Sequence, residues 1–115
     1  MSRQLGEFEQ LLLFAVLNLG DEAYGVELRK SIEQRTGRRI SPGAVYTAMD
    51  RLEAKGLVKS WLGDDTPARG GRRRKFFEVT PSGATQLLGS YTALQSMADG
   101  AMPKLRKAAL RGGTG

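Results

Sequence analysis

The sequence predicts a mainly α-helical protein that carries one small β-hairpin. Two observations lead to this fold class. Apolar residues recur with helical spacing before residue 56 and again after Thr80-Pro81. Between these regions lie two short runs of strand-forming residues, separated by a glycine-rich turn. We expect residues 1–80 to form one domain, residues 81–110 a C-terminal helix for dimerisation, and residues 111–115 a disordered tail.

The composition restricts the chemistry that is open to the chain. Its 115 residues carry a net charge of +6, which favours a polyanion such as nucleic acid or an anionic membrane surface. It has no cysteine and no histidine, which excludes disulfides, thiolate nucleophiles, imidazole catalysis and most zinc sites. Gly70-Gly71 lacks the spacing of a phosphate loop, and we expect no enzyme activity, metal or cofactor. Without a long apolar run or a signal-like start, the sequence predicts a cytoplasmic protein that does not enter a membrane.

The first helix is predicted over residues 5–19 and is apolar on nearly all sides. Phe8, Leu11 and Leu12 keep the helical period, but Leu13 and Phe14 are apolar too. Such a helix is buried on more than one side, and in a domain this small one side meets another subunit. A turn at residues 20–22 leads to a second helix over residues 23–35, which ends in a short connector.

The third helix, predicted over residues 41–55, has the clearest boundaries. Ser41 can cap it, Pro42 suits its first position, and Gly56 can end it in the left-handed conformation. One face is buried, because apolar residues follow at i, i+3, i+4 and i+7: Val45, Ala48, Met49 and Leu52. The outward face consists of Gly43, Thr47, Asp50, Arg51 and Ala54, with Tyr46 on its flank.

This outward face permits two interpretations. The small residues Gly43 and Ala44 would let the helix approach DNA closely. Hydroxyls of Tyr46 and Thr47 can bind phosphates, and Arg51 can reach a phosphate or a guanine edge. The alternative is an ordinary solvated face, which Asp50 supports because DNA repels a carboxylate.

The predicted hairpin decides between these interpretations. Its strands lie at residues 57–62 and 74–80, and the turn between them ends in a run of cations that includes Arg72, Arg73 and Arg74. A charge run is usually a solvated surface, but arginine is also suited to the narrow minor groove of DNA. Placed directly after the third helix, the basic hairpin indicates a winged helix-turn-helix that reads DNA, with Arg38 and Arg39 adding charge before the helix.

Two further features stay open at the level of sequence. Trp61 either packs within its strand or stacks on a planar ligand. The last helix is predicted over residues 81–99, with a helical period of leucines. Because Gly100 and Pro103 interrupt it, residues 104–110 form either a short separate helix or an extension of the last one.

These elements resemble the PadR family of bacterial transcriptional regulators. The resemblance covers residues 5–94 and rests on Tyr24-Gly25, Ser41-Pro42-Gly43 with Tyr46 and Leu52-Glu53, Gly56-Leu57-Val58, residues 73–80, and Ser82-Gly83. It implies a homodimeric winged-helix repressor whose third helix lies in the major groove of a palindromic operator. A proline that commonly follows the tyrosine is Thr47 here. The short last helix resembles that of the short-tailed members.

The family resemblance also implies which helices form the dimer and what the protein binds. In this family the first and last helices form the interface, and many members respond to phenolic or drug-like compounds, so the resemblance allows a small-molecule effector. The candidates for binding double-stranded DNA are Tyr24, Arg38, Arg39, Ser41, Gly43, Ala44, Tyr46, Thr47, Arg51, Arg72, Arg73 and Arg74. The candidates for the homodimer interface are Phe8, Leu11, Leu12, Leu87, Leu88, Tyr91, Leu94 and Met97. The alternative function is a winged-helix adaptor that binds a protein without contacting DNA, but it does not predict a basic wing.

Overall fold

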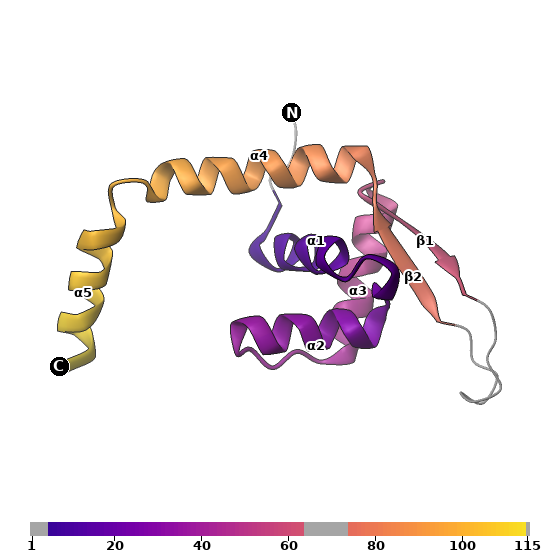
Figure 1. Ribbon diagram of the computed structural model, residues 1–115, viewed down its shortest axis with the longest axis horizontal. Helices are drawn as coiled ribbons and strands as arrows, with labels where there is room; N and C mark the ends of the chain where they lie inside the picture. The colour runs from indigo at the N-terminus through magenta and orange to yellow at the C-terminus, as the bar shows by residue number, and fades with distance from the viewer. Residues whose placement is uncertain (1–4, 64–73, 115) are drawn as a thin grey trace.

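The computed structural model describes residues 5–63 and 74–114, with side chains up to residue 112. Its elements follow in the order α1 (Glu7–Leu19), a 3₁₀ turn (Gly20–Glu22), α2 (Gly25–Thr36), α3 (Pro42–Ala54), β1 (Val58–Leu62), β2 (Lys75–Val79), α4 (Pro81–Ala98) and α5 (Met102–Thr114). Helices α1, α2 and α3 and the hairpin gather into one body, as Figure 1 shows. Helix α4 leaves the hairpin, crosses α1 and extends beyond the body, and α5 lies at its far end. The predicted fold class, mainly helical with one hairpin, is confirmed.

The core lies where the three body helices meet the start of the hairpin. Its fully buried side chains are Leu12, Leu13, Leu28, Val45, Met49, Leu52 and Leu57. The predicted inner face of α3 is confirmed, because Val45, Met49 and Leu52 are at most 1% exposed. Ser41 caps this helix as predicted, since its Oγ accepts a hydrogen bond of 3.1 Å from the backbone N–H of Ala44.

The hairpin is antiparallel and is tied to the start of α2. Val58 pairs with Val79 and Trp61 with Phe76 across the two strands. On its other edge β2 pairs with the segment before α2, where Tyr24 lies opposite Phe76 and the N–H of Phe77 donates to the carbonyl of Ala23 at 2.9 Å. The strand period therefore directs Phe77 into the core and Phe76 to the outer face of the hairpin.

The last helix, predicted over residues 81–99, is followed by a separate helix, which is one of the two alternatives left open for residues 104–110, and this second helix also takes in residues 111–114 of the predicted tail. Helix α4 ends at Ala98, Gly100 turns the chain with a φ of +80°, and α5 continues to Thr114 as a separate helix. Pro103 does not interrupt a helix here. It occupies the first turn of α5, where the N–H that proline lacks would have no helical partner.

The start of α4 is fixed to the loop between α3 and β1. The Thr80 Oγ1 caps α4 by accepting from the N–H of Gly83 at 3.0 Å, and its hydroxyl donates to the carbonyl of Gly56 at 2.6 Å. The N–H of Thr80 donates to the carbonyl of Leu57 at 3.0 Å. A Cβ on Gly83 would collide with that same carbonyl oxygen, so the helix can approach this closely only with glycine at the position.

This close approach predicts that alanine substitutions at two glycines of α4 change the stability of the protein in opposite directions. Gly83→Ala forces α4 away from Leu57 and should lower the free energy of unfolding by roughly 1–3 kcal/mol. The matched control is Gly89→Ala, because a Cβ there would meet no atom within 4 Å. Its better helix propensity should raise stability by up to about 1 kcal/mol. Both values can be measured by urea unfolding followed by circular dichroism, and a loss of equal size in both variants would contradict the packing argument.

Candidate nucleic-acid interface

Helix α3 presents a continuous exposed face on the side opposite the core. Gly43, Thr47, Asp50 and Arg51 lie on it and are exposed, as the helical spacing predicts, and Ala44 is exposed beside them. A Cβ on Gly43 would meet no atom within 4 Å, so open space surrounds the first turn. The face therefore offers small groups at its N-terminal end, and a hydroxyl and a guanidinium further along.

Tyr46 connects this face to the start of α2. Its ring lies against Gly25, where an added Cβ would come within 2.6 Å of the phenolic oxygen. Glycine at the first position of α2 is thus what allows the ring to lie there, while the side chain stays 47% exposed. The hydroxyl of Tyr46 is held at the N-terminal end of α2 as a result.

A hollow that we call the wing-root recess lies between α2, α3 and the base of the hairpin. It has a volume of about 430 Å³. It brings together three of the predicted residues, Tyr24, Tyr46 and Arg74. Two cations that the sequence analysis did not assign, Lys30 and Lys75, also line it, together with Gly25, Val26 and Glu27. Lys75 directly follows the basic run of the wing and so carries a signal in the sequence, whereas Lys30 lies in the second helix, away from that run.

An aromatic row supports the recess from the outer face of the hairpin. The Trp61 ring stacks on Phe76 with centroids 6.1 Å apart, and Phe76 meets the Tyr24 ring edge-on at 5.4 Å. The Arg74 guanidinium lies over the Tyr24 ring, 4.2 Å from its centroid. Trp61 thus packs on its neighbour, one of its two predicted roles, while remaining 46% exposed.

The predicted arginines occupy different environments. Arg74 is half-buried, and its Nη2 is shielded from solvent with no hydrogen-bond partner in the described part of the chain. Arg38 pairs with Glu7 of α1 at 2.8 Å, and Arg39 is exposed. Arg72 and Arg73 lie outside the described residues.

A second ion pair joins α1 to the end of α3. The Lys55 Nζ donates to Glu9 at 2.8 Å, and the Glu9 side chain is 19% exposed. Partial burial raises the pKa of Glu9, but this is outweighed by the hydrogen bonds from Lys55 and from the N–H of Gly6 and by the charges of Lys55 and Arg51. The net effect is a pKa below the ordinary value, so Glu9 stays ionised beside the two cations.

The predicted interface residues divide into two groups. Leu88, Tyr91, Leu94 and Met97 are exposed along α4 and are available to a second subunit. Leu12 and Leu87 are at most 3% exposed, so we correct their assignment and place them in the core of the protomer. Phe8 and Leu11 are half-buried against that core.

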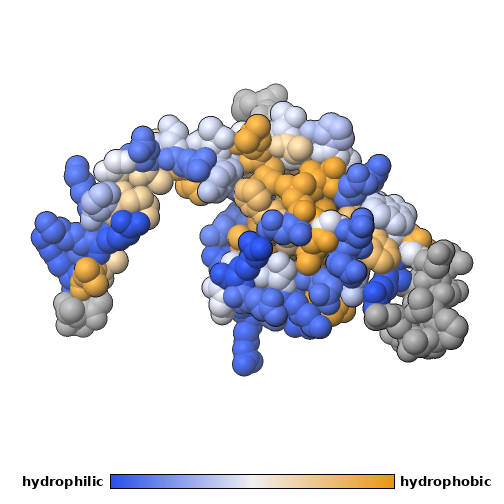
Figure 2. Space-filling view, viewed as in Figure 1, coloured by the Kyte–Doolittle hydropathy of each residue, from blue (hydrophilic) through white to orange (hydrophobic). Residues whose placement is uncertain are grey.

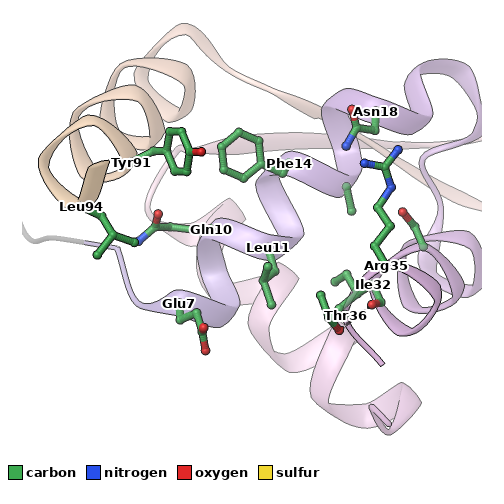
Figure 3. Close-up of a pocket in the computed structure, with 12 residues that line it drawn as sticks. Glu7, Gln10, Leu11, Phe14, Asn18, Ile32, Arg35, Thr36, Tyr91 and Leu94 are labelled. Carbon is green, nitrogen blue, oxygen red and sulfur yellow. Dashed lines mark hydrogen bonds between the residues drawn. The ribbon is translucent and has the colours of Figure 1, made fainter. Parts of the chain in front are cut away.

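A groove lies between α1, α2 and α4, and we call it the α1–α4 groove. Its volume is about 470 Å³, and its apolar lining includes Leu11, Phe14 and Ile32. Phe14 and Tyr91 point toward one another across it, with ring centroids 5.4 Å apart (Figure 3). Figure 2 shows apolar side chains gathered where α4 crosses α1 and hydrophilic ones over α2.

The described part of the chain offers neither a metal-binding cluster nor a membrane-spanning helix. No group of three acidic side chains in residues 5–63 and 74–114 is arranged to hold a metal ion. None of the described helices is both long enough and apolar enough to cross a lipid bilayer.

Comparison with known proteins gives one consistent family. The profile of the transcriptional regulator PadR-like family matches residues 13–88. The chain is 35% identical over 78 residues to the transcriptional regulator Rv3488 of Mycobacterium tuberculosis, which covers 68% of each chain. A PadR family transcription regulator from Clostridium difficile R20291 superposes with a TM-score of 0.67 at 26% identity, covering 85% of this chain and 98% of that one. One from Eggerthella lenta DSM 2243 gives a TM-score of 0.66 at 28% identity and covers 86% of each chain.

The contact between Gly25 and Tyr46 predicts an energetic coupling between these residues. Gly25→Ala displaces the Tyr46 ring and should lower stability, whereas the same substitution in a Tyr46→Ala background meets no ring and should not. The double-mutant cycle should give a coupling on the order of 1 kcal/mol. Chemical unfolding of the four proteins measures it, and additive effects would show that the ring does not depend on Gly25.

The lowered pKa of Glu9 predicts a pH dependence of stability. Because the folded-state pKa lies below the ordinary value of 4.5, ionised Glu9 stabilises the fold above that pH, and the contribution is lost as the pH falls through the folded value. Thermal unfolding between about pH 6 and pH 3 should therefore show a shallower decline for Glu9→Gln than for the parent. Lys55→Gln, which removes the partner, should also reduce the slope. Identical slopes in all three proteins would contradict the assignment.

Proposed function

The chain belongs to the PadR-like family of transcriptional regulators, and we propose that it acts as a homodimeric repressor that binds a palindromic DNA operator. The observation that carries this proposal is the exposed face of α3 with the basic wing-root recess beside it. The α3 face can contact base edges, and the wing-root recess can bind the sugar-phosphate backbone of DNA. DNA-binding proteins commonly use base contacts for specificity and phosphate contacts for positioning.

In this proposal α3 enters the major groove by its N-terminal half. Open space around Gly43 and the single methyl of Ala44 let the helix backbone come close to the base edges. Thr47 and Arg51 lie four residues apart and so follow one line along the helix. Arg51 has the geometry to donate two hydrogen bonds to a guanine, and Thr47 can contact a base or a phosphate.

The wing-root recess would hold a backbone phosphate. The first N–H groups of α2 have no helical partner, and Arg74, Lys30 and Lys75 place positive charge around them. Glu27 also lines the recess, but its carboxylate lies 3.7 Å from the ammonium of Lys30. A phosphate oxygen would supply the acceptor that the Arg74 Nη2 lacks among the described residues.

The homodimer would form through the exposed apolar side of α4. Leu88, Leu94 and Met97 are each more than 60% exposed, which is unusual for such side chains unless a partner covers them. A two-fold axis would set two copies of α3 in successive major grooves about 34 Å apart, and occupation of the operator would then block transcription sterically. The small-molecule effector that the family resemblance allows stays a prediction.

The proposal predicts binding that depends on salt and on Arg51. DNA selected by the purified full-length protein from a random pool should contain an inverted repeat, and its affinity should fall steeply with salt because each neutralised phosphate releases counterions. Arg51→Ala should weaken binding to the selected site by about 1–3 kcal/mol and relax the base preference at one position of each half-site. Fluorescence anisotropy at several salt concentrations measures both effects.

The matched control is Lys107→Ala, which removes one charge from α5, far from the α3 face. It should lower affinity much less than Arg51→Ala and leave the base preference unchanged. If no sequence is enriched, or if both variants weaken binding equally, α3 does not read the operator. The adaptor interpretation would then account better for the fold.

A further inference from the structure

We propose that α5 is an interfacial helix that binds the surface of an anionic lipid bilayer, with its apolar side in the headgroup layer and its cations beside the lipid phosphates. This inference goes beyond the proposed function and does not rest on it. The proposed homodimer uses the apolar side of α4, and the proposed DNA contacts use α3 and the wing-root recess, so neither gives α5 a role. The helix also lies beyond residues 13–88, where the family profile matches.

The side-chain charges of α5 are all positive. The helix carries Lys104, Arg106, Lys107 and Arg111, and no Asp or Glu follows Asp99 in the sequence. In the body, by contrast, Lys55 pairs with Glu9 across two helices. Because α5 supplies no carboxylate side chain of its own, an anionic surface is the partner that matches its charge, and each cation near such a surface adds to the attraction.

The cations of α5 are separated from its apolar side chains. Residues at i, i+3 and i+7 share one side of a helix. By this spacing one face consists of Met102, Leu105 and Ala109, and the opposite face of Lys104, Lys107 and Arg111. DNA would engage only the cationic face and leave Leu105, which is 57% exposed, in water. A bilayer interface accepts both faces, because long cationic side chains can extend to the phosphates while the apolar face lies deeper, and it is therefore favoured over DNA.

Helix α5 is placed where a flat surface can reach it. Every residue from 102 to 112 is exposed, and Figure 1 shows α5 at the far end of α4, clear of the body formed by the other helices and the hairpin. The turn at Gly100 gives α5 a direction different from that of α4. The helix would lie on the bilayer and not cross it, in agreement with the finding that none of the described helices is able to span one.

The length and composition of α5 set the strength of binding. A helix of 13 residues is marginal in water without tertiary packing, so burial of Met102 and Leu105 at a bilayer would also stabilise the helix itself. Its sequence contains no Trp, Tyr or Phe, so the apolar area that it can bury is small. Binding should therefore require anionic lipid as well as apolar contact, and should weaken as salt screens the charges.

Vesicle co-sedimentation of the full chain tests the proposal. The protein should bind vesicles of equal parts phosphatidylglycerol and phosphatidylcholine, and bind vesicles of phosphatidylcholine alone only weakly. Leu105→Gln should lower the partition coefficient about tenfold. Lys107→Gln should lower it about fivefold. The matched control is Lys59→Gln, which removes the same charge from an exposed position on β1 and should leave the partition coefficient unchanged.

Hydrogen exchange of the parent protein locates the contact without depending on a variant. Amide exchange in residues 102–112 should slow when the anionic vesicles are added, whereas exchange in α3 should not change. The double variant Lys104→Gln/Lys107→Gln should lose this slowing. Glutamine is close to leucine and lysine in helix propensity, and circular dichroism of each variant checks that its helix content matches that of the parent.

The outcomes separate this inference from the proposed function. If Lys59→Gln weakens vesicle binding as much as Lys107→Gln, or if exchange slows in the hairpin and not in α5, the helix is not the lipid-binding element and the inference is wrong. It is also wrong if the vesicles do not bind and Lys107→Gln weakens DNA binding as much as Arg51→Ala, because α5 then contacts DNA. Vesicle binding through α5 by a protein that enriches no DNA sequence would support this inference and overturn the proposed function.

Discussion

The arrangement of the molecule depends on one contact between backbones, where the first turn of α4 lies on the carbonyl of Leu57. No side chain intervenes, because a Cβ on Gly83 would occupy the position of that oxygen. Thr80 secures the contact by capping α4 and by donating to the carbonyl of Gly56, immediately before Leu57. Leu57 is fully buried, so the junction is tied to the core and not only to a surface loop. The direction of α4 is thereby fixed relative to both α3 and the hairpin.

A second close approach, between Gly25 and Tyr46, shapes the candidate DNA-binding surface, and it too is possible only because glycine has no side chain. The missing side chain of glycine makes room for a ring from the neighbouring helix, and the ring then holds a hydroxyl at the start of α2. On the other side of the recess, Tyr24 is held by Phe76 and covered by the guanidinium of Arg74. The candidate phosphate contacts are therefore preorganised by packing, which reduces the conformational entropy that DNA binding would cost.

The sequence was sufficient for the body of the fold because its signals are local. Ser41 and Pro42 predict the start of α3, and the spacing of Val45, Met49 and Leu52 predicts its buried face. Features that depend on tertiary packing could not be predicted from the sequence. Nothing in the helical period distinguishes Leu87, which belongs to the core, from Leu88, which is exposed, because the distinction depends on where α4 leaves the body.

The same limit applies to charge and to helix breakers. Arg38 and Arg39 are equivalent in the sequence, but only the folded chain sets Glu7 beside Arg38. From sequence alone Pro103 predicts an interruption, although a proline in the first turn is compatible with a new helix. The wing-root recess was predicted only in part. Lys30 lies in α2 and Arg74 lies just before β2, so their separation along the chain gives no indication that both line the same recess.

The fixed direction of α4 matters for DNA recognition because the structure that connects the two copies of α3 in a dimer sets the distance between them. In the proposed dimer that connection runs from α3 through Leu57 and Gly83 into α4 and across the two-fold axis. A hinge anywhere along it would let the separation vary, and only a fraction of the dimers would match the spacing of a palindrome at any moment. Glycine within the first turn of a helix lowers its propensity by up to about 1 kcal/mol relative to alanine. That loss is offset if the contact it permits keeps the two α3 helices in register with the DNA. The turn at Gly100 comes after the end of α4, so the change of chain direction there lies outside the connection between the two α3 helices.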